Sequence, residues 1–545
     1  MSYRRIAASA AVLAAGISLV PGLAHAADPS TGKAHGVTTP GLSKAAAPKF
    51  TDFNSPAVQG KTAAPQAPST GANPTLAVGL HAVTTSAHGL KLDTAITSAD
   101  APLTISIAWG DNTTSQERAA GTQTVTTPHT YAHVGTYTIK VTVVDQNTQA
   151  VVSNEVVVTT EGSDYTPYGP TRLLDTRNGT GAAQAKVAPY TATHLKIAGN
   201  GNIPAGVTAV ALNVTVTNTA SGGHITAYAG GGQRPSTSNV NFVPGQTVPN
   251  LTIVPVSKDG YVDLYNGGWE SVDLIADVTG YFTQSASSGY TPLNPARIVD
   301  TRSGLGTAQG QVAGQTSFGV QISGQGGVNP GATAVALNVT VTNPRQDGHL
   351  TVYPGGQQAP TASNVNFTAD QTIANSVIVP VGPDGKINVR NGAWAGIDVI
   401  VDVVGYYSPY SASAYVPVRP TRLLDTRDSA DWADGPLGGR GYIYMPLASG
   451  YPHTKGFVLN STVTNTRDSG FLAVTPDPYT KEQYENGTAG WPATPTSSTL
   501  NWTTGKTVPN LVQAGVGYTG IIDFWNQSDG DIDLIVDLFG VYEDN

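Results

Sequence analysis

One set of charged side chains has the types and the spacing that could do chemistry. Arg172, Asp175 and Arg177 stand together in Thr171-Arg-Leu-Leu-Asp-Thr-Arg177, and Asp273 and Asp277 follow much later in the chain. Such a set could bind an anion or a sugar, or it could pair internally. We favour internal pairing, because the arginine fork suits a partly buried carboxylate. The predicted structural charge cluster comprises Arg172, Asp175, Arg177, Asp273, Asp277, Arg297, Asp300, Arg302, Asp398, Asp402, Arg422, Asp425, Arg427, Asp533 and Asp537.

Tryptophans at glycine-rich turns form a second candidate set. Asn266-Gly-Gly-Trp269 and Asn391-Gly-Ala-Trp394 lie between the last two expected strands of a repeated unit. A loop tryptophan beside amide and carboxylate groups is typical of a site that stacks on a sugar ring. The alternative is that each tryptophan folds back over the end of its domain. The candidate ligand-binding residues are Trp269, Trp394, Tyr265 and Trp491, the last from an aromatic insertion in the third unit.

Patterns of enzymes and metal sites are missing from the sequence. There is no cysteine, no His-Glu-x-x-His helix and no Gly-x-Ser-x-Gly elbow. His224 and His349 correspond, but Phe471 replaces them in the third unit. Asp273 and Asp277 could offer oxygen ligands to calcium, yet no loop has EF-hand spacing. Paired carboxylates for glycoside hydrolysis stay open in principle, but no inserted catalytic domain interrupts the repeats. We therefore expect a non-enzymatic protein without metal or cofactor.

These residues belong to one unit that is written three times. Arg172, Arg297 and Arg422 recur at an interval of 125 residues, and each unit ends on a similar Asp-rich strand that finishes in glycine. A period this long is that of a domain and not of a solenoid turn. The sequence predicts three tandem domains at 164–283, 289–408 and 414–545.

Each unit contains about eight short strand-like runs separated by Gly, Pro and Asn. In the run 210–217, Val and Leu alternate with Ala, Asn and Thr, the pattern of a half-buried strand. Pairing of the first strand with the last would bring the arginines to the aspartates and close the domain. The expected architecture is a two-sheet sandwich or jelly roll, with a trefoil-like barrel as the alternative.

A different β unit precedes the repeats. Its Trp109-Gly-Asp-Asn, His129-Thr-Tyr-Ala-His-Val-Gly-Thr-Tyr137 and Thr142-Val-Val-Asp145 are similar to the motifs of the PKD domain. That resemblance implies an immunoglobulin-like sandwich over 74–162 with a spacing or binding role. Trp109 and Tyr137 are expected in its core, and Asp111 is expected to fix a turn rather than bind calcium. The predicted fold class is all-β, with one immunoglobulin-like sandwich followed by three sandwich or jelly-roll-like repeats.

The repeats themselves resemble the Arg-x-x-Asp-Thr-Arg modules of secreted actinobacterial surface and cell-wall proteins. Some of those modules are attached to cell-wall hydrolases, and others occur in surface proteins without an enzyme. The resemblance implies an extracellular setting and names no ligand.

The N-terminal segment is predicted to direct export. Residues 1–26 combine a basic start, an apolar stretch and a closing Ala-His-Ala, which is the layout of a secretory signal peptide. A membrane anchor is the alternative, and the Arg4-Arg5 pair leaves both the general secretory and the twin-arginine route open. Residues 27–73, rich in Ala, Pro, Thr, Ser and Gly, are expected to form a disordered linker. We expect a secreted protein without a membrane span in its mature form, held at the cell surface non-covalently if it stays there.

Composition narrows the class of partner. The net charge is −9 and only 12% of residues are charged, so no electrostatic feature favours a nucleic acid. The leading interpretation is a secreted binding protein for polysaccharide or cell-envelope glycan. The alternatives are a structural or adhesive surface protein that acts through protein contacts, and an accessory protein that targets a cell-wall hydrolase. The oligomeric state is left open.

Overall fold

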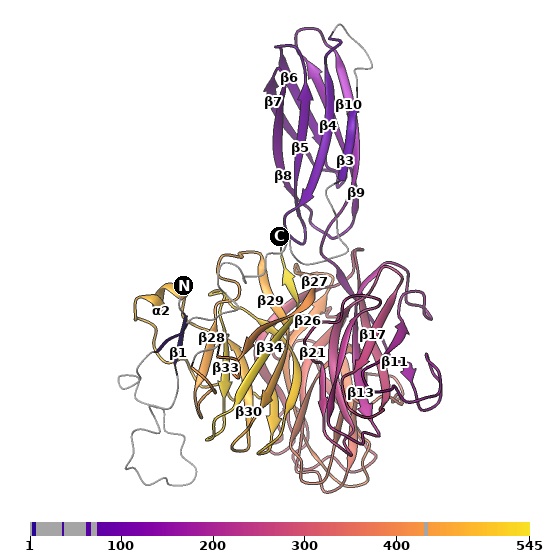
Figure 1. Cartoon of the computed structure of the whole chain (residues 1–545), viewed down its shortest axis with the longest axis vertical. Coiled ribbons are helices and arrows are strands. Elements are labelled where there is room, and N and C mark those ends of the chain that lie inside the picture. Colours follow the sequence, from indigo (N-terminus) through magenta and orange to yellow (C-terminus); the bar gives the residue numbers. More distant parts are fainter. Residues whose placement is uncertain (1–2, 7–34, 38–60, 67–72, 430–433, 545) are drawn as a thin grey trace.

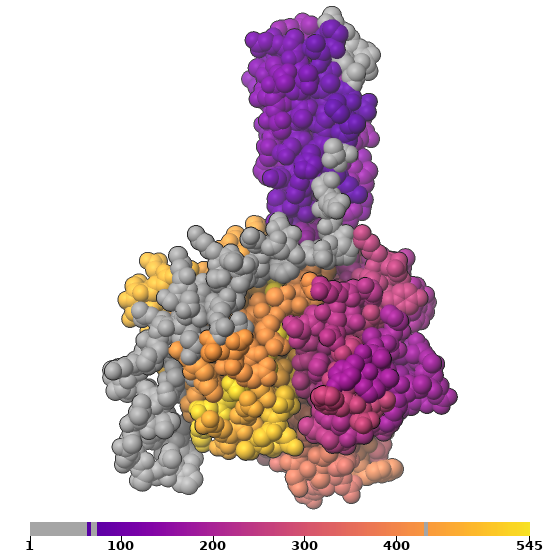
Figure 2. Space-filling model, in the orientation of Figure 1, coloured from indigo at the N-terminus to yellow at the C-terminus, as the bar shows by residue number. Residues whose placement is uncertain are grey.

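The structure is a computed structural model that describes residues 3–6, 35–37, 61–66, 73–429 and 434–544. The chain forms a tall N-terminal sandwich, here called the stalk, on a broad body made by the three repeats (Figures 1 and 2). Two short strands, β1 (Tyr3–Ile6) and β2 (His35–Val37), fall inside the predicted signal and linker segments, and β1 pairs with β28 of the third repeat.

The stalk is a sandwich of two four-stranded antiparallel sheets, β3-β4-β5-β8 and β10-β9-β6-β7. Trp109 is fully buried in its core and Tyr137 packs against that core. Asp111 fixes its turn by accepting from the backbone and hydroxyl of Thr113, and it also contacts His129. The strands are β3 (Lys61–Gln66), β4 (Ala77–Thr84), β5 (Gly89–Thr97), β6 (Pro102–Ala108), β7 (Thr114–Ala120), β8 (Gln123–Thr130), β9 (Thr136–Asp145) and β10 (Val151–Thr159).

The predicted boundary of the stalk at residue 74 is wrong, because β3 lies within the expected linker. β3 pairs with β4, and the side-chain amide of Asn154 donates to the backbone carbonyl of Ala64. Pro65 is tolerated here because β3 is an edge strand, where a missing N–H need not break a ladder. The rest of the predicted linker before β3, apart from β2, lies outside the described residues.

Each repeat contributes eight strands, four to each of two sheets, which confirms the predicted sandwich against the trefoil alternative; in repeat 3, β1 and β2 extend the outer sheet to six strands. The first, last, third and sixth strands form an inner sheet, and the other four form an outer sheet. Repeat 1 contains β11 (Asp164–Asp175), β12 (Ala192–Lys196), β13 (Val207–Thr217), β14 (Gly223–Ala229), β15 (Val240–Phe242), β16 (Val248–Pro255), β17 (Tyr261–Asn266) and β18 (Asp273–Thr283).

Repeats 2 and 3 copy this order. Repeat 2 contains β19 (Gly289–Asp300), β20 (Ser317–Gln321), β21 (Ala334–Thr342), β22 (Gly348–Pro354), β23 (Val365–Phe367), β24 (Ile373–Pro380), β25 (Lys386–Asn391) and β26 (Asp398–Ser408). Repeat 3 adds one short helix and contains β27 (Ala414–Asp425), β28 (Tyr442–Met445), β29 (Thr454–Thr464), β30 (Gly470–Pro476), α2 (Lys481–Glu485), β31 (Leu500–Trp502), β32 (Val508–Gly515), β33 (Ile522–Asn526) and β34 (Asp533–Glu543).

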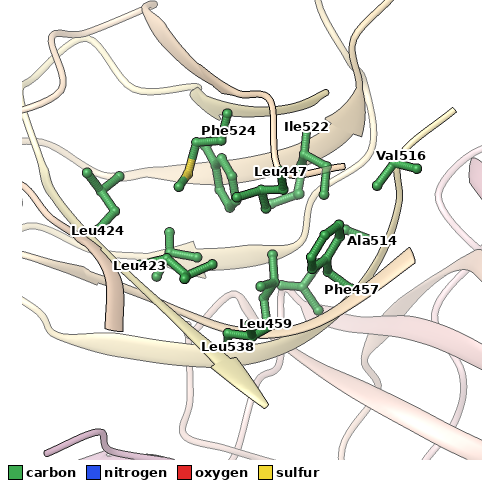
Figure 3. Close-up of a cluster of buried hydrophobic side chains, with 14 of the residues drawn as sticks. Leu423, Leu424, Leu447, Phe457, Leu459, Ala514, Val516, Ile522, Phe524 and Leu538 are labelled. Carbon is green, nitrogen blue, oxygen red and sulfur yellow. The ribbon is translucent and has the colours of Figure 1, made fainter. Parts of the chain in front are cut away.

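Each repeat has its own core between its two sheets. In repeat 3, Phe457, Leu459 and Leu538 of the inner sheet meet Ile522 and Phe524 of the outer sheet (Figure 3). The side chains that alternate with these point away from the sandwich core. On the inner sheets, these side chains are covered by the neighbouring repeats.

The inner sheets of the three repeats pack against one another around a shared second core. Its members come from every repeat: Tyr165, Ala209, Ala211, Leu251, Ile253, Phe282, Tyr290, Ala334, Ala336, Ile378, Tyr407, Tyr415, Val458, Leu511, Phe539 and Tyr542. The half-buried interpretation of run 210–217 is therefore wrong, since all eleven residues of β13 are buried. The face that carries Ala, Asn and Thr contacts the neighbouring repeats and not water.

Hydrogen bonds around this core repeat in a closed cycle. Asn213 of repeat 1 donates to the carbonyl of Ser363 in repeat 2, and Asn338 of repeat 2 donates to Ser498 in repeat 3. Asn460 of repeat 3 donates to the carbonyl of Ser238 in repeat 1, which closes the cycle. A second cycle joins the side-chain amides, through the pairs Asn250–Asn460, Asn375–Asn213 and Asn510–Asn338. The three tandem domains thus form a ring with pseudo-threefold symmetry inside one chain.

The stalk stands on the end of the ring where the repeats begin (Figure 1). Ser163 exchanges backbone hydrogen bonds with Tyr415, and Gln284 donates to the carbonyl of Thr160. The junction is tight at Gly162, where an added Cβ would lie 2.7 Å from the Cβ of Ala414. The stalk is therefore seated on the ring by direct contacts.

Candidate functional site

The charge cluster forms where the first and last strands of each repeat pair, as the sequence predicts. Arg172 lies opposite Asp277 in the β11–β18 ladder, and its guanidinium donates through Nε to Oδ1 at 2.9 Å and through Nη2 to Oδ2 at 3.2 Å. Arg177 pairs with Asp175 in the same way, donating through Nε to Oδ1 at 2.9 Å and through Nη2 to Oδ2 at 2.7 Å. The counterparts in repeats 2 and 3 keep this geometry: Arg297–Asp402, Arg302–Asp300, Arg422–Asp537 and Arg427–Asp425.

Asp273 does not pair with an arginine, contrary to the expectation. Its carboxylate accepts from the hydroxyl of Thr176 at 2.9 Å and from the amide of Asn218 at 2.7 Å. The reason is that Arg177 already finds Asp175 two residues away, so the start of β18 is left to neutral donors. Asp398 and Asp533 have equivalent partners in their repeats.

The cluster also ties neighbouring repeats together. Arg172 donates through Nη2 to the carbonyl of Thr361 in repeat 2, at 3.5 Å, and Arg297 reaches Thr496 in repeat 3 at 3.2 Å. Burial raises the pKa of Asp277, while hydrogen bonds and charge from Arg172 oppose the rise. The hydrogen bond from Arg177 holds the pKa of Asp175 below its usual range. Each guanidinium is thus engaged by a carboxylate, and those of Arg172 and Arg297 also reach the neighbouring repeat, which favours the structural role over an anion site.

The tryptophan turns are held by hydrogen bonds and present their side chains outward. Asn266, fully buried, donates to the carbonyls of Val187 and Ala188 and of Glu270, and its Oδ1 accepts from the N–H of Gly268. Asn391 makes the same contacts in repeat 2. On these clamped turns Trp269 is 75% exposed and Trp394 is 83% exposed. The fold-back alternative is therefore wrong.

The other two aromatic candidates are placed differently. Tyr265 is half-buried on the outer sheet of repeat 1, and the guanidinium of Arg234 lies over its ring at 4.1 Å from the centroid. Trp491 is half-buried and meets Tyr442 and Trp525 edge-on, at 5.2 and 5.9 Å between centroids. Neither offers an open ring face of the kind that stacking requires.

In repeat 3 the insertion covers the outer sheet. α2 begins at a capping box between Thr480 and Gln483, and Tyr484 stacks on Tyr444 at 3.8 Å between centroids. Beneath it, burial and the neighbouring Asp477 carboxyl raise the pKa of Asp523 well above its usual range. The tryptophan position of the turn is Asp529 in this repeat, paired with Arg440. Repeat 3 therefore departs from the other two both on its outer sheet and at its turn.

Sequence reasoning missed three residues at the Trp269 turn or on the outer sheet that leads to it. Tyr190 meets Trp269 edge-on at 5.6 Å between centroids and is itself 51% exposed. His194 bonds to Asp263 across the outer sheet of repeat 1, and Arg234 approaches from the β14–β15 loop. No repeated motif marks these residues, because repeats 2 and 3 carry other residues at the equivalent positions. Only the register between neighbouring strands shows that the three residues lie near one another.

Two further features of the described residues bear on the site. They contain no group of three or more His, Cys, Asp or Glu side chains that could hold a metal ion. Within the same residues, no helix has the length and apolarity to cross a membrane.

Comparisons with known proteins identify no family. No family model matches the chain, and no curated protein matches it. Among solved structures, the CBM22-1-CBM22-2 tandem domain of Xyn10C from Paenibacillus barcinonensis is 12% identical, covering 45% of this chain and 100% of that one, with a TM-score of 0.15. A carbohydrate-binding module structure from the β-sandwich superfamily is 14% identical, covering 63% and 98%, with a TM-score of 0.14. An archaeal virus protein with a triple jelly-roll fold is 8% identical, covering 72% and 86%, with a TM-score of 0.16.

TM-scores this low carry no argument about function, so the class rests on the sheets themselves. The chain is an all-β protein of four β-sandwiches, each built from paired four-stranded sheets. Three of the sandwiches close into a ring, and the fourth stands on it.

Proposed function

We propose that this chain is a secreted, non-enzymatic protein that binds polysaccharide or cell-envelope glycan through the tryptophan turns of its ring. One observation carries the proposal: Trp269 and Trp394 occupy equivalent turns in two repeats and are both largely exposed. Scattered apolar side chains on a surface need no explanation, but the same large ring at two symmetry-related, clamped turns does.

The chemistry of the turns suits a sugar. An indole offers a flat apolar face to the C–H face of a sugar ring. Because Asn266 and Asn391 fix the turns before any ligand arrives, little conformational entropy is lost on binding. Two sites on one rigid ring also add avidity for a polymer that can reach both.

The position of the turns supports presentation to an external ligand. β18 runs from Asp273, next to the Trp269 turn, to Thr283, next to the stalk. An eleven-residue strand spans about 34 Å, so the turns lie at the far end of the ring from the stalk. The stalk would then act as a spacer on the side facing away from the ligand.

The structural alternative, association between chains through the repeats, has less support. The surfaces on which the repeats contact one another are already occupied within a single chain, since each cycle of hydrogen bonds closes. In the accessory alternative the chain uses the same glycan site, and it differs only in also binding a partner protein that is a hydrolase.

The test is pull-down of the purified secreted chain on insoluble cell-envelope polysaccharide. The variant Trp269→Ala with Trp394→Ala is expected to lose at least about tenfold in affinity, because both stacking surfaces are gone. Tyr410→Ala is the matched control, since Tyr410 is 88% exposed but belongs to the connection between β26 and β27 on the stalk side of the ring. Unchanged binding by the double variant, or no binding by the parent chain, would refute the proposal, and turnover of the glycan would refute its non-enzymatic part.

A further inference from the structure

The outer sheet of repeat 1 carries two cations, Lys196 and Arg234, that rest on aromatic rings, an arrangement that the described contacts show in neither of the other two repeats. β17 lies between β12 and β14, and Tyr261, Asp263 and Tyr265 alternate along it on the outward face. His194 and Lys196 of β12 pair with this strand at Asp263 and Tyr261. With Arg234 from the β14–β15 loop, these side chains form what we call the basic strip: His194, Lys196 and Arg234, backed by Tyr261 and Tyr265.

Two cations of the basic strip rest on aromatic rings. The Lys196 ammonium lies 4.3 Å from the ring centroid of Tyr261, and the Arg234 guanidinium lies 4.1 Å from that of Tyr265. A cation on a ring is held in place without being neutralised. A guanidinium so placed keeps planar N–H donors that match a carboxylate or a phosphate.

The carboxylate within the strip does not cancel these two charges. Asp263 is buried, and its oxygens accept from His194 and from the backbone N–H of Gly231 at 3.0 Å. The Lys196 ammonium donates to the backbone carbonyl of Asp259, at 2.6 Å, and not to a carboxylate. The strip is therefore a local positive surface on a chain whose net charge is −9.

The basic strip is continuous with the proposed glycan site. Tyr265 precedes the Trp269 turn on the same strand and hairpin, and Tyr190, at the approach to β12, contacts Trp269 edge-on. Positions 261 and 265 are about 14 Å apart on an extended strand, so the strip prolongs the tryptophan surface along the sheet. A ligand that follows it must be extended.

Repeats 2 and 3 supply the comparison that makes the strip specific. In repeat 2 the positions of Arg234 and Tyr265 hold Ala359 and Arg390, and Arg390 donates to Gln315 at 2.8 Å. No cation rests on an aromatic ring there, among the described contacts. In repeat 3 the insertion with α2 lies over the corresponding face. Only repeat 1 joins an exposed tryptophan to such cations, within the part of the chain that the structure describes.

We infer that repeat 1 binds an anionic glycan, a sugar polymer that carries carboxylate or phosphate groups, with Trp269 stacking on a sugar and the basic strip pairing with the anions. This inference rests on the proposed function and narrows its ligand. The anion meets Arg234 and Lys196, while the neutral part of the polymer lies on Trp269 and Tyr190.

The experiment compares polymers of matched size on the full secreted chain. The probes are a polyuronate, the same polymer after reduction of its carboxyl groups, and a poly(glycerol phosphate). Carboxyl reduction is expected to weaken binding at least tenfold, and binding to the charged polymers is expected to weaken as salt rises from low to high ionic strength. Preference for the polyuronate assigns the carboxylate as the anion, and preference for poly(glycerol phosphate) assigns the phosphate.

Variants separate the strip from the tryptophan turns. Arg234→Ala with Lys196→Ala is expected to lose about tenfold or more on the charged polymers and to bind the reduced polymer as the parent does. Arg390→Ala with Lys386→Ala removes two cations from the matching sheet of repeat 2 and is expected to change little. Arg234→Lys keeps the charge and loses the planar fork, so an intermediate loss is expected.

The outcomes distinguish this inference from the proposed function. If Trp269→Ala with Trp394→Ala abolishes binding while the Arg234 and Lys196 variant binds charged polymers as well as the parent, the basic strip is refuted and the glycan site stands. Equal affinity of the parent for charged and reduced polymers would also refute the strip and leave the glycan site in place. Absence of binding to every polymer refutes both.

Discussion

The stalk and the ring are built from the same kind of sandwich, yet their strands are used differently. β10 of the stalk alternates buried and exposed residues, whereas every residue of β13 in the ring is buried. The sequence of β13 alternates Val and Leu with other side chains, and β9, the neighbour of β10, alternates in the same way yet exposes Lys140, so alternation alone does not say whether the second face meets water. The difference lies in the side chains that face away from the sandwich core: in β10 they include Glu155, and in β13 they are only Ala, Asn and Thr.

Small and uncharged side chains are what a sheet needs to meet another sheet. Ala209 and Ala211 allow the inner sheets to approach, and Asn213 can donate and accept between repeats. Lysine or glutamate at these positions would bury a charge without a partner. The low charge of the chain therefore has a structural reason in the ring, beyond any ligand that the surface meets.

The largest effect is expected from a lysine placed on the face of the inner sheet that contacts the other repeats. Ala211→Lys places an ammonium in the shared core, where Ala211 has no exposed surface. We expect the ring to lose at least about 5 kcal/mol of its free energy of unfolding, or not to assemble. Urea unfolding measures the change. Ser153→Lys, on the outward face of β10, is the control and is expected to change stability by less than about 0.5 kcal/mol. Similar effects of the two lysines would contradict the contrast.

The buried ion pairs of the ring and the exposed ion pair of the stalk are expected to differ in the same way in their contribution to stability. Arg172→Ala leaves the buried Asp277 carboxylate without its partner, and a loss of about 3 kcal/mol is expected near neutral pH. Since burial raises the pKa of Asp277 and Arg172 opposes the rise, the carboxyl of the variant protonates more readily, and the loss should shrink as the pH falls. Urea unfolding at several pH values measures this.

The matched pair in the stalk is Lys140 and Glu155, whose side chains are both about half exposed. Lys140→Ala is expected to cost less than about 1 kcal/mol at any of these pH values. A pH-independent loss in Arg172→Ala, or an equal loss in the stalk variant, would count against a structural role for the charge cluster.

Much of this fold could be predicted from the sequence, because the repeat is explicit. The interval between Arg172, Arg297 and Arg422 gives the domain count, and the alternating runs give eight strands and a sandwich. Opposite charges at the two ends of a unit correctly indicated that its first and last strands pair. These are properties of one repeat and need no knowledge of its neighbours.

What the sequence could not supply depends on contacts between distant segments. The ring appears only when Asn213 is seen to reach Ser363 in the next repeat. Whether Trp269 folds back depends on the Asn266 clamp, which closes on a segment far away in sequence. Tyr265 looked open for stacking because nothing in its own strand shows that Arg234 covers it.

A smaller effect is expected from the amides that close the ring. Asn375→Ala removes the donor to Asn213 and to the carbonyl of Asn364, and the acceptor for the N–H of Leu251. Stranding such buried groups should cost about 1–3 kcal/mol. Hydrogen exchange of the Leu251 amide should quicken accordingly.

In the stalk, Thr142→Ala is the counterpart, since Thr142 bonds to Ser153 on an exposed face. Water replaces that bond, so stability should change by less than about 0.5 kcal/mol. Unaltered exchange at Leu251 in the Asn375 variant would show that the amide cycle does not hold the repeats together.

The last expected effect is a pH dependence of docking, where the stalk and the ring meet. Burial raises the pKa of Glu161 to about 7 and that of Glu543 to about 7, against 4.5 for an ordinary glutamate. Glu543 accepts from the backbone N–H of Ala87 in the stalk, at 2.8 Å. A carboxyl whose pKa is raised on docking stabilises the docked state fully below its undocked pKa, and this stability is lost as the pH rises through 7. Between pH 5 and 7 each glutamate should cost the junction about 2 kcal/mol.

The measurement is the exchange protection of the Ala87 amide, corrected for the intrinsic pH dependence of exchange. Protection should fall from pH 5 to pH 8 in the parent chain, while amides in the sandwich core of each repeat keep theirs. Glu161→Gln with Glu543→Gln removes the titration and should flatten the profile, since a neutral amide has no charge to desolvate. Protection that rises with pH, or an unchanged slope in the double variant, would mean that these carboxyls do not govern the junction. The stalk and the ring would then be joined by the apolar and backbone contacts at Gly162 and Ser163 alone.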